Sequence, residues 1–192
     1  LLQRANNDYT TIDLEHAEEL AYRELIDSIR YIPLGDECGV MGNIANIITY
    51  KGRFYIQEEQ FDRVFIYDDT GRCLKKIDNK GRGPGEYLRI ESIDINTEKE
   101  ELMLVDGMSD KLFFYDLDGN FKSIHSIRYF QTENTLCLRD SVFLHISAPS
   151  QNFGNEGLYG YALVLSKGNE NFLKGYRYLP LQVGYKLSLI HI

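Results

Sequence analysis

An internal repeat constrains this chain more than any other feature of its sequence. The segment FYIQEEQFDRVFIYDDTGRCLKKI, residues 54–77, aligns without a gap with LMLVDGMSDKLFFYDLDGNFKSIH, residues 102–125, at an offset of 48 residues. Apolar or aromatic residues share columns, among them Phe54, Ile56, Val64, Phe65 and Tyr67 with Leu102, Leu104, Leu112, Phe113 and Tyr115, and the turn sequences DDTG and DLDG also align. Self-similarity at such a period is the signature of an architecture in which each copy is one supersecondary unit.

Each copy is predicted to consist of strands. Apolar residues alternate with polar ones in short runs, and the chain contains 14 Tyr and 10 Phe, residue types that favour strands. Asp and Gly close the turns because Asp bonds to nearby backbone and Gly accepts positive φ. With a further strand predicted at residues 90–95, the unit has about four strands in ~48 residues, the dimension of a β-propeller blade.

A third, less regular copy follows the first two. Residues 141–146 and 159–169 take the places of its second and third strands, and Gly168 lies 49 residues after Gly119. An insertion of about eight residues lies between them, in SAPSQNFGNEGL. We therefore predict an all-β protein, a partial β-propeller of about three blades built from four-stranded antiparallel sheets.

The predicted boundaries follow from the repeat. An N-terminal segment, residues 1–44, with a short helix within residues 14–29 and a strand within residues 28–34, precedes blades at about 45–89, 90–137 and 138–186. The tail at 187–192 has two interpretations: the stretch KLSLIHI resembles a translated sequencing-adapter scar, and it also alternates like a strand.

The repeat sequences resemble a known family. GRGPGEY, followed by DKLFFYDLDGNF, is similar to the six-bladed β-propeller family of envelope lipoproteins from Gram-negative anaerobes, and more distantly to NHL-repeat propellers. The similarity covers about residues 9–168. It implies a scaffold of the cell envelope with largely uncharacterised ligands, attached to a membrane only through a lipidated cysteine upstream. A closed six-bladed ring would need roughly 290 residues at this period, so we expect the chain to be a fragment.

Charge and cysteine content narrow the classes of function. The net charge of −8 disfavours binding to nucleic acid or anionic membranes. The three cysteines are odd in number and lack CxxC spacing, which predicts buried free thiols rather than disulfides or a zinc site. No apolar run approaches the ~18 residues of a membrane span, and no signal peptide is predicted within the chain.

The glycine-rich stretch NKGRGPGEY lies between the first two predicted blades. A phosphate cradle would need GxGxxG or GxxxxGK[ST] before a helix, whereas these glycines are spaced GxGxG and strand-like sequence follows. We therefore predict a shaped crossover. Candidate ligand-binding residues lie here and in the insertion, where aromatic rings offer contact area to a glycan, peptide or protein: Arg82, Glu86, Tyr87, Asn152, Phe153, Tyr159 and Tyr161.

Catalytic residues are not predicted. The acidic residues recur with the repeat, which favours turn and cap roles, and His125 and His145 fall on strand positions. No metal spacing and no G-x-S-x-G elbow occur, and no cofactor is expected. We predict a non-catalytic binding or scaffold propeller. The alternatives are a carbohydrate-active lyase or hydrolase whose site lies partly in further blades and, less favoured because of the acidic charge, an NHL-like RNA binder.

Overall fold

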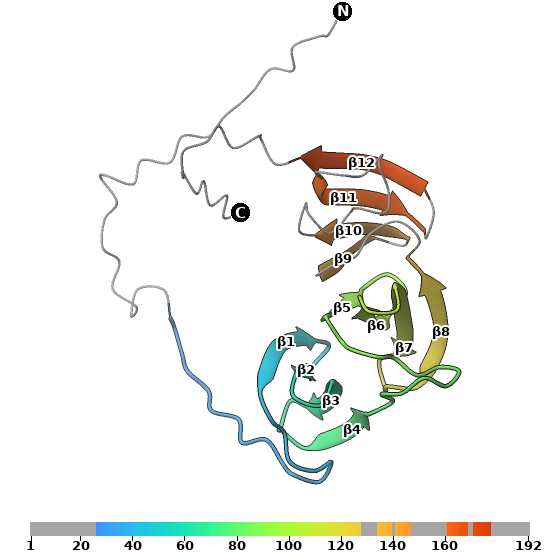
Figure 1. Ribbon diagram of the computed structural model, residues 1–192. Coiled ribbons are helices and arrows are strands. Elements are labelled where there is room, and N and C mark those ends of the chain that lie inside the picture. Colours follow the sequence, from blue (N-terminus) through green and yellow to red (C-terminus); the bar gives the residue numbers. More distant parts are fainter. Residues whose placement is uncertain (1–25, 128–133, 140, 147–160, 169–170, 178–192) are drawn as a thin grey trace, which may run out of the picture. The chain divides into compact units, whose positions relative to one another are not determined.

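The computed structural model describes residues 26–127, 134–139, 141–146, 161–168 and 171–177 (Figure 1). The chain divides into two units, residues 1–31 and 32–192, and every described strand belongs to the second. In the described ranges there is no helix, and hence none able to cross a membrane. Within the described residues, twelve strands form three four-stranded antiparallel sheets, which confirms the predicted fold class.

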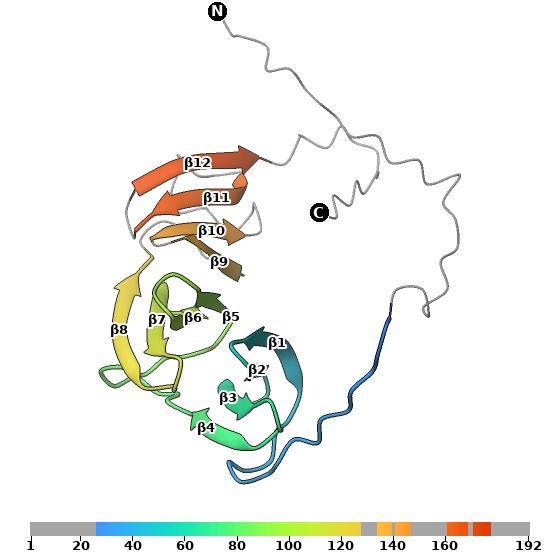
Figure 2. The ribbon, with the colours of Figure 1, turned by 180° about the vertical axis from the view of Figure 1, so that it is seen from behind.

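The strands follow one another within each sheet in chain order, as Figures 1 and 2 show. Blade 1 consists of β1 (Ile44–Tyr50), β2 (Arg53–Glu58), β3 (Arg63–Asp68) and β4 (Cys73–Ile77). Blade 2 consists of β5 (Ser92–Asn96), β6 (Glu101–Asp106), β7 (Lys111–Asp116) and β8 (Phe121–Ser126). Blade 3 consists of β9 (Asn134–Arg139), β10 (Val142–Ile146), β11 (Tyr161–Lys167) and β12 (Asn171–Arg177). The first strand of blade 3 begins at Asn134, four residues before residue 138, where the third blade was predicted to begin.

The first strands of successive blades are neighbours, since β5 contacts both β1 and β9. The repeat is also visible in the register: the third and fourth strands shift at Ile66/Tyr67 in blade 1 and at Phe114/Tyr115 in blade 2. This arrangement, a series of four-stranded meanders with their first strands adjacent, is that of propeller blades.

The core lies between the blades. We call the face of a blade toward the preceding part of the chain its leading face, and the opposite face its trailing face. The trailing face of blade 1 packs on the leading face of blade 2 through the residues Tyr55, Val64, Ile66, Ile77, Leu102, Leu104, Phe113 and Tyr115. The trailing face of blade 2 packs on the leading face of blade 3 through residues that include Met103, Phe114, Phe143 and Val164.

The leading face of blade 1 is covered by the N-terminal side of the same unit, residues 32–43, which we call the cap segment. Ile56, Phe65 and Tyr67 are buried there, with Cys38 and Met41 packed against them. No helix or strand occurs in residues 26–43, so the strand predicted within residues 28–34 is wrong. Most of the helix predicted within residues 14–29 lies outside the described residues.

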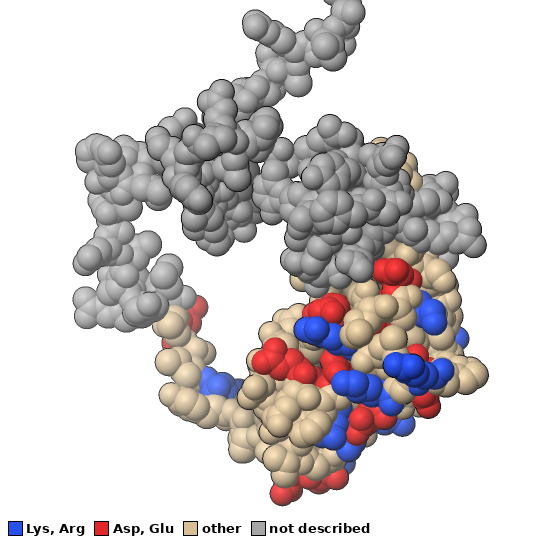
Figure 3. Space-filling view, in the orientation of Figure 1, with Lys and Arg blue, Asp and Glu red and all other residues tan. Residues whose placement is uncertain are grey.

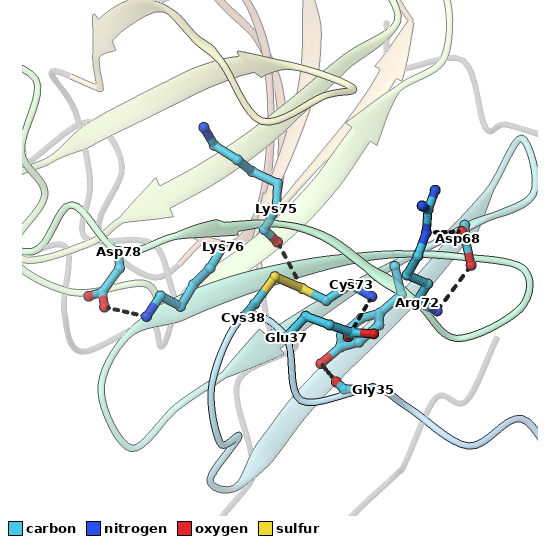
Figure 4. The surroundings of a disulfide bond; sticks show 10 residues. Gly35, Glu37, Cys38, Asp68, Arg72, Cys73, Lys75, Lys76 and Asp78 are labelled. Carbon is cyan, nitrogen blue, oxygen red and sulfur yellow. Dashed lines mark hydrogen bonds and ion pairs between the residues drawn. A yellow bond between two sulfur atoms is a disulfide. The ribbon is translucent and has the colours of Figure 1, made fainter.

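A disulfide joins Cys38 of the cap segment to Cys73 of β4, with the two Cα atoms 6.0 Å apart (Figure 4). The prediction of free thiols is therefore wrong for these two cysteines. Their sequence separation of 35 and the irregular conformation of the cap segment leave no local pattern that would reveal the pairing. Cys137 is outside any disulfide, as predicted, but it is half-buried rather than buried.

Candidate functional site

The crossover loop, residues 78–91, connects β4 to β5 and is anchored by Tyr87. The ring of Tyr87 is 0% exposed and packs edge-on against Phe113, with centroids 5.9 Å apart. Its hydroxyl donates to the carbonyl of Asp62 at 2.8 Å and accepts from the backbone N–H of Asn79 at 3.1 Å. Burial raises the pKa of Tyr87 above its usual range. The structure thus places Tyr87 in the core, where it fixes the loop, rather than at the loop surface.

The glycines of the crossover loop surround a carboxylate of the protein itself. Oε2 of Glu86 accepts a hydrogen bond from the N–H of Gly83 at 2.7 Å. A Cβ on Gly81 would lie 1.9 Å from the same oxygen and would displace the carboxylate, whereas Gly85 has φ +83°, so a side chain at Gly85 would strain the turn. The loop is a shaped crossover that holds the Glu86 carboxylate, in agreement with the prediction against a phosphate cradle.

Arg82 lies in the exposed part of the crossover loop. Its neighbours Gly83 and Pro84 are also exposed, and Arg82 has no ion-pair partner within the described ranges. The base of the loop is held by Lys80, whose Nζ lies 2.5 Å from Oδ2 of Asp62. A cationic side chain therefore projects from a loop whose backbone is fixed on both sides.

The other candidate residues belong to the connection between β10 and β11. Asn152, Phe153 and Tyr159 lie outside the described residues. Tyr161 is the first residue of β11 and pairs with Arg177, although its side chain is not described. Ile146 and Tyr161, the two ends of this connection, lie at the edge of blade 3 that corresponds to the edge of blade 1 where the crossover loop begins. The two segments predicted to carry ligand-binding residues, the crossover loop and the β10–β11 connection, thus start from equivalent edges of their blades.

The repeated acidic residues have turn and cap roles, as predicted. Asp106, only 1% exposed, accepts from the N–H groups of Met108 and Ser109 and, from the crossover loop, from Leu88 N–H at 2.8 Å. Glu58 in the equivalent position caps the β2–β3 turn. These carboxylates stabilise backbone and are not arranged as a catalytic pair.

Asp68 and Asp116 occupy equivalent positions in the repeat, at the ends of β3 and β7. Their carboxylates close the β3–β4 and β7–β8 turns, at the blade edge opposite to Glu58 and Asp106. Hydrogen bonds from Thr70 and Arg72 lower the pKa of Asp68 to about 2. Burial raises the pKa of Asp116, but hydrogen bonds from Asn120 and neighbouring groups outweigh it and the net shift is downward. Both side chains serve as structural acceptors in the ionised form.

A cleft of about 430 Å³ lies between blades 1 and 2 at this opposite edge, lined by Lys51, Arg53, Glu100, Asp116, Leu117 and Asp118. Its charges pair across the two blades: Lys51 with Glu100, and Arg53 with Asp118 at 2.7 Å. Positive and negative side chains are likewise interspersed over the surface visible in Figure 3. The cleft is a polar seam between blades, and its charged groups already satisfy one another.

His145 of β10 is a structural histidine. Its Nδ1 lies 2.9 Å from Oγ1 of Thr135, and its Nε2 lies 2.8 Å from Oγ of Ser166, so both ring nitrogens are hydrogen-bonded within blade 3. Burial lowers its pKa to about 4. Among the residues that the structure describes, no group of three or more His, Cys, Asp or Glu side chains is placed to hold a metal.

The blade geometry defines a protein of the β-propeller class. Residues 9–183 match the family described as a domain of unknown function, DUF4934, and the chain belongs to this family. No curated protein matches the chain.

Solved structures support the same fold. A crystal structure from Bacteroides fragilis NCTC 9343, described as a "Putative exported protein", is 19% identical with a TM-score of 0.70 and covers 82% of this chain and 44% of its own. The structure of U3-55K is 11% identical with a TM-score of 0.50, covering 70% and 39%. The chain thus spans less than half the length of each of these structures.

Proposed function

We propose that this protein is a non-catalytic binding or scaffold propeller of the bacterial cell envelope, of the six-bladed lipoprotein type, which contacts a glycan, peptide or partner protein through loops at one edge of its blades. The observation that carries the proposal is the crossover loop, whose backbone is held by Tyr87 and Glu86 while Arg82 stays exposed. Loops positioned by a rigid scaffold are common sites of recognition.

Two observations support a location outside the cytoplasm. The similar structure from Bacteroides fragilis carries the description of an exported protein. The Cys38–Cys73 disulfide is of the kind that persists in oxidising compartments and is rare in the cytosol. We therefore place the binding function in the periplasm or at the outer membrane.

The test is an array of bacterial and plant polysaccharides and unmodified peptides probed with the purified chain and with Arg82→Ala. Arg72→Ala is a matched control, because it removes the same charge from an exposed side chain that pairs with Asp68 at the other edge. We expect a ligand whose binding falls at least tenfold in Arg82→Ala and is retained in Arg72→Ala. Equal binding by all three proteins would argue against the crossover loop, and turnover of a bound polysaccharide would favour the enzyme alternative.

A further inference from the structure

The turn between β2 and β3 presents an aromatic ring that the turn itself does not need. Phe61 lies in this turn and is 45% exposed. The turn is held by Glu58, whose carboxylate accepts hydrogen bonds from the N–H groups of Gln60 and Phe61 at 3.1 and 3.2 Å. These bonds involve only the backbone and the acidic cap, so the phenyl ring is available for another role.

Blade 2 uses the position of Phe61 differently. Ser109 occupies this position in the repeat, and its hydroxyl donates to Oδ2 of Asp106 at 2.6 Å. Lys111 likewise stands where blade 1 has Arg63. The serine supports its turn, whereas Phe61 forgoes that hydrogen bond and presents a ring to the solvent. Phe61 and Arg63 therefore depart from the repeat together.

Arg63 holds the ring of Phe61 in one orientation. The guanidinium carbon lies 4.4 Å from the centroid of the ring, a cation–π contact. The guanidinium is itself held, because Nε lies 3.1 Å from Oδ2 of Asp78. One face of the ring is thus covered, and the exposed area lies on the remaining face and the edge. A partner that stacks on this ordered ring has little side-chain entropy to offset.

The turn is joined to the crossover loop at the residue that follows Phe61. Asp62 accepts a hydrogen bond from the Tyr87 hydroxyl through its carbonyl oxygen, at 2.8 Å, and one from Ile90 N–H through Oδ1, at 3.1 Å. The turn and the start of the loop lie at the same edge of blade 1. The exposed ring is therefore fastened to the loop that carries Arg82.

The chemistry around the ring favours a sugar over an apolar peptide side chain. Glu59 and Gln60, the two residues before Phe61, are polar and exposed. Apolar anchors of a protein partner bind in well-packed pockets that exclude water. A pyranose instead combines an apolar face of C–H groups, which packs on the negative face of an aromatic ring, with hydroxyls that need hydrogen-bond partners around it.

We propose that Phe61 is a stacking platform for a pyranose ring of a glycan, with Arg63 supporting the aromatic ring from its covered face. Glu59 and Gln60 supply a hydrogen-bond acceptor and a mixed donor and acceptor for the sugar hydroxyls. The inference rests on the binding function proposed above and narrows its ligand to a carbohydrate.

The experiment uses the absence of tryptophan from the sequence, because Phe61→Trp then creates a single fluorescent reporter at the platform. Met108→Trp is the matched control, since Met108 is 65% exposed in the equivalent turn of blade 2. The probes are cello-, xylo-, malto- and galacturono-oligosaccharides. We expect at least one of them to change the emission of Phe61→Trp saturably and to leave that of Met108→Trp unchanged. Unchanged emission with every probe, or equal changes in both variants, would overturn the inference.

The array of polysaccharides and peptides described above separates this inference from the proposed function. We expect polysaccharide binding to fall at least tenfold in Phe61→Ala and to be retained in Phe61→Tyr and Met108→Ala. Binding that depends on Arg82 but is equal in Phe61→Ala and the parent, or binding of peptides alone, would overturn the platform and leave the proposed function standing. Binding that depends on Phe61 and not on Arg82 would support the platform and argue against the crossover loop.

Discussion

Glu86 accepts a hydrogen bond from the backbone N–H of Gly83, and this contact explains why the crossover loop is so rich in glycine. The carboxylate lies where a bound anion would lie in a phosphate loop, against backbone that has no side chains to exclude it. Gly81 and Gly83 therefore make room for an internal anion, whereas Gly85 supplies a positive φ, and the neighbouring Arg82 stays exposed.

The conformation of the crossover loop can be tested at Gly85. This residue has φ +83° with no atom near the position of a Cβ, so Gly85→Ala introduces backbone strain without a clash. We expect it to lower the free energy of unfolding by about 1–2 kcal/mol, measured by urea denaturation. Pro84→Ala, at an exposed neighbour, is the control and should cost less than about 1 kcal/mol. Equal stability of Gly85→Ala and the parent would contradict the turn geometry.

The cap role of the repeated acidic residues can be tested by comparing Asp106→Ala with Asp118→Ala. Asp106 is buried and accepts backbone N–H groups from its own turn and from Leu88, which would lose their partner. Leaving buried donors unsatisfied costs about 1–3 kcal/mol each, so a loss of at least 2 kcal/mol is expected.

Asp118 provides the control because its ion pair with Arg53 is largely exposed. Exposed pairs contribute about 0–1 kcal/mol, and the loss should lie in that range and shrink at high salt. If the two alanine variants were equally stable in thermal and urea unfolding, Asp106 would have no special role in holding its turn and the crossover loop.

The fold could be predicted from the sequence because the blade repeats. Tyr67 and Tyr115, or Gly71 and Gly119, fall in matched columns, so each strand and turn was signalled twice. The cap segment occurs once and has no period, so neither its position nor its disulfide could be found in this way. For Tyr87, its place beside the glycines suggested a surface ligand residue. The buried Tyr87 hydroxyl instead bonds to the carbonyl of Asp62, which is distant in the sequence. Local sequence does not reveal such a partner.

Loss of the disulfide should destabilise the chain. Cys38 and Cys73 are 35 residues apart, and closing a loop of this length stabilises a folded protein by roughly 2–4 kcal/mol. Urea unfolding of Cys38→Ser/Cys73→Ser at a concentration where it is monomeric should show this loss. Cys137→Ser, which removes the cysteine outside the disulfide, should change the free energy of unfolding by less than about 1.5 kcal/mol.

His145 predicts a pH dependence with a definite sign. Its pKa is lowered to about 4 by burial, whereas an unfolded chain has a histidine pKa of about 6.5. Between these values the unfolded chain binds a proton that the folded chain does not, so unfolding becomes more favourable as the pH falls. The contribution of His145 is therefore complete above pH 6.5 and declines toward pH 4, by at most about 3 kcal/mol.

The measurement is the free energy of urea unfolding at intervals between pH 7 and pH 4, with His145→Gln compared with His125→Gln. The control variant lies on β8, where His125 contacts Phe114, and it retains His145. Carboxylates contribute equally to both pH profiles, so the difference between the profiles isolates His145. A steeper decline in His125→Gln than in His145→Gln is expected. Parallel profiles would mean that burial does not hold His145 in its neutral form.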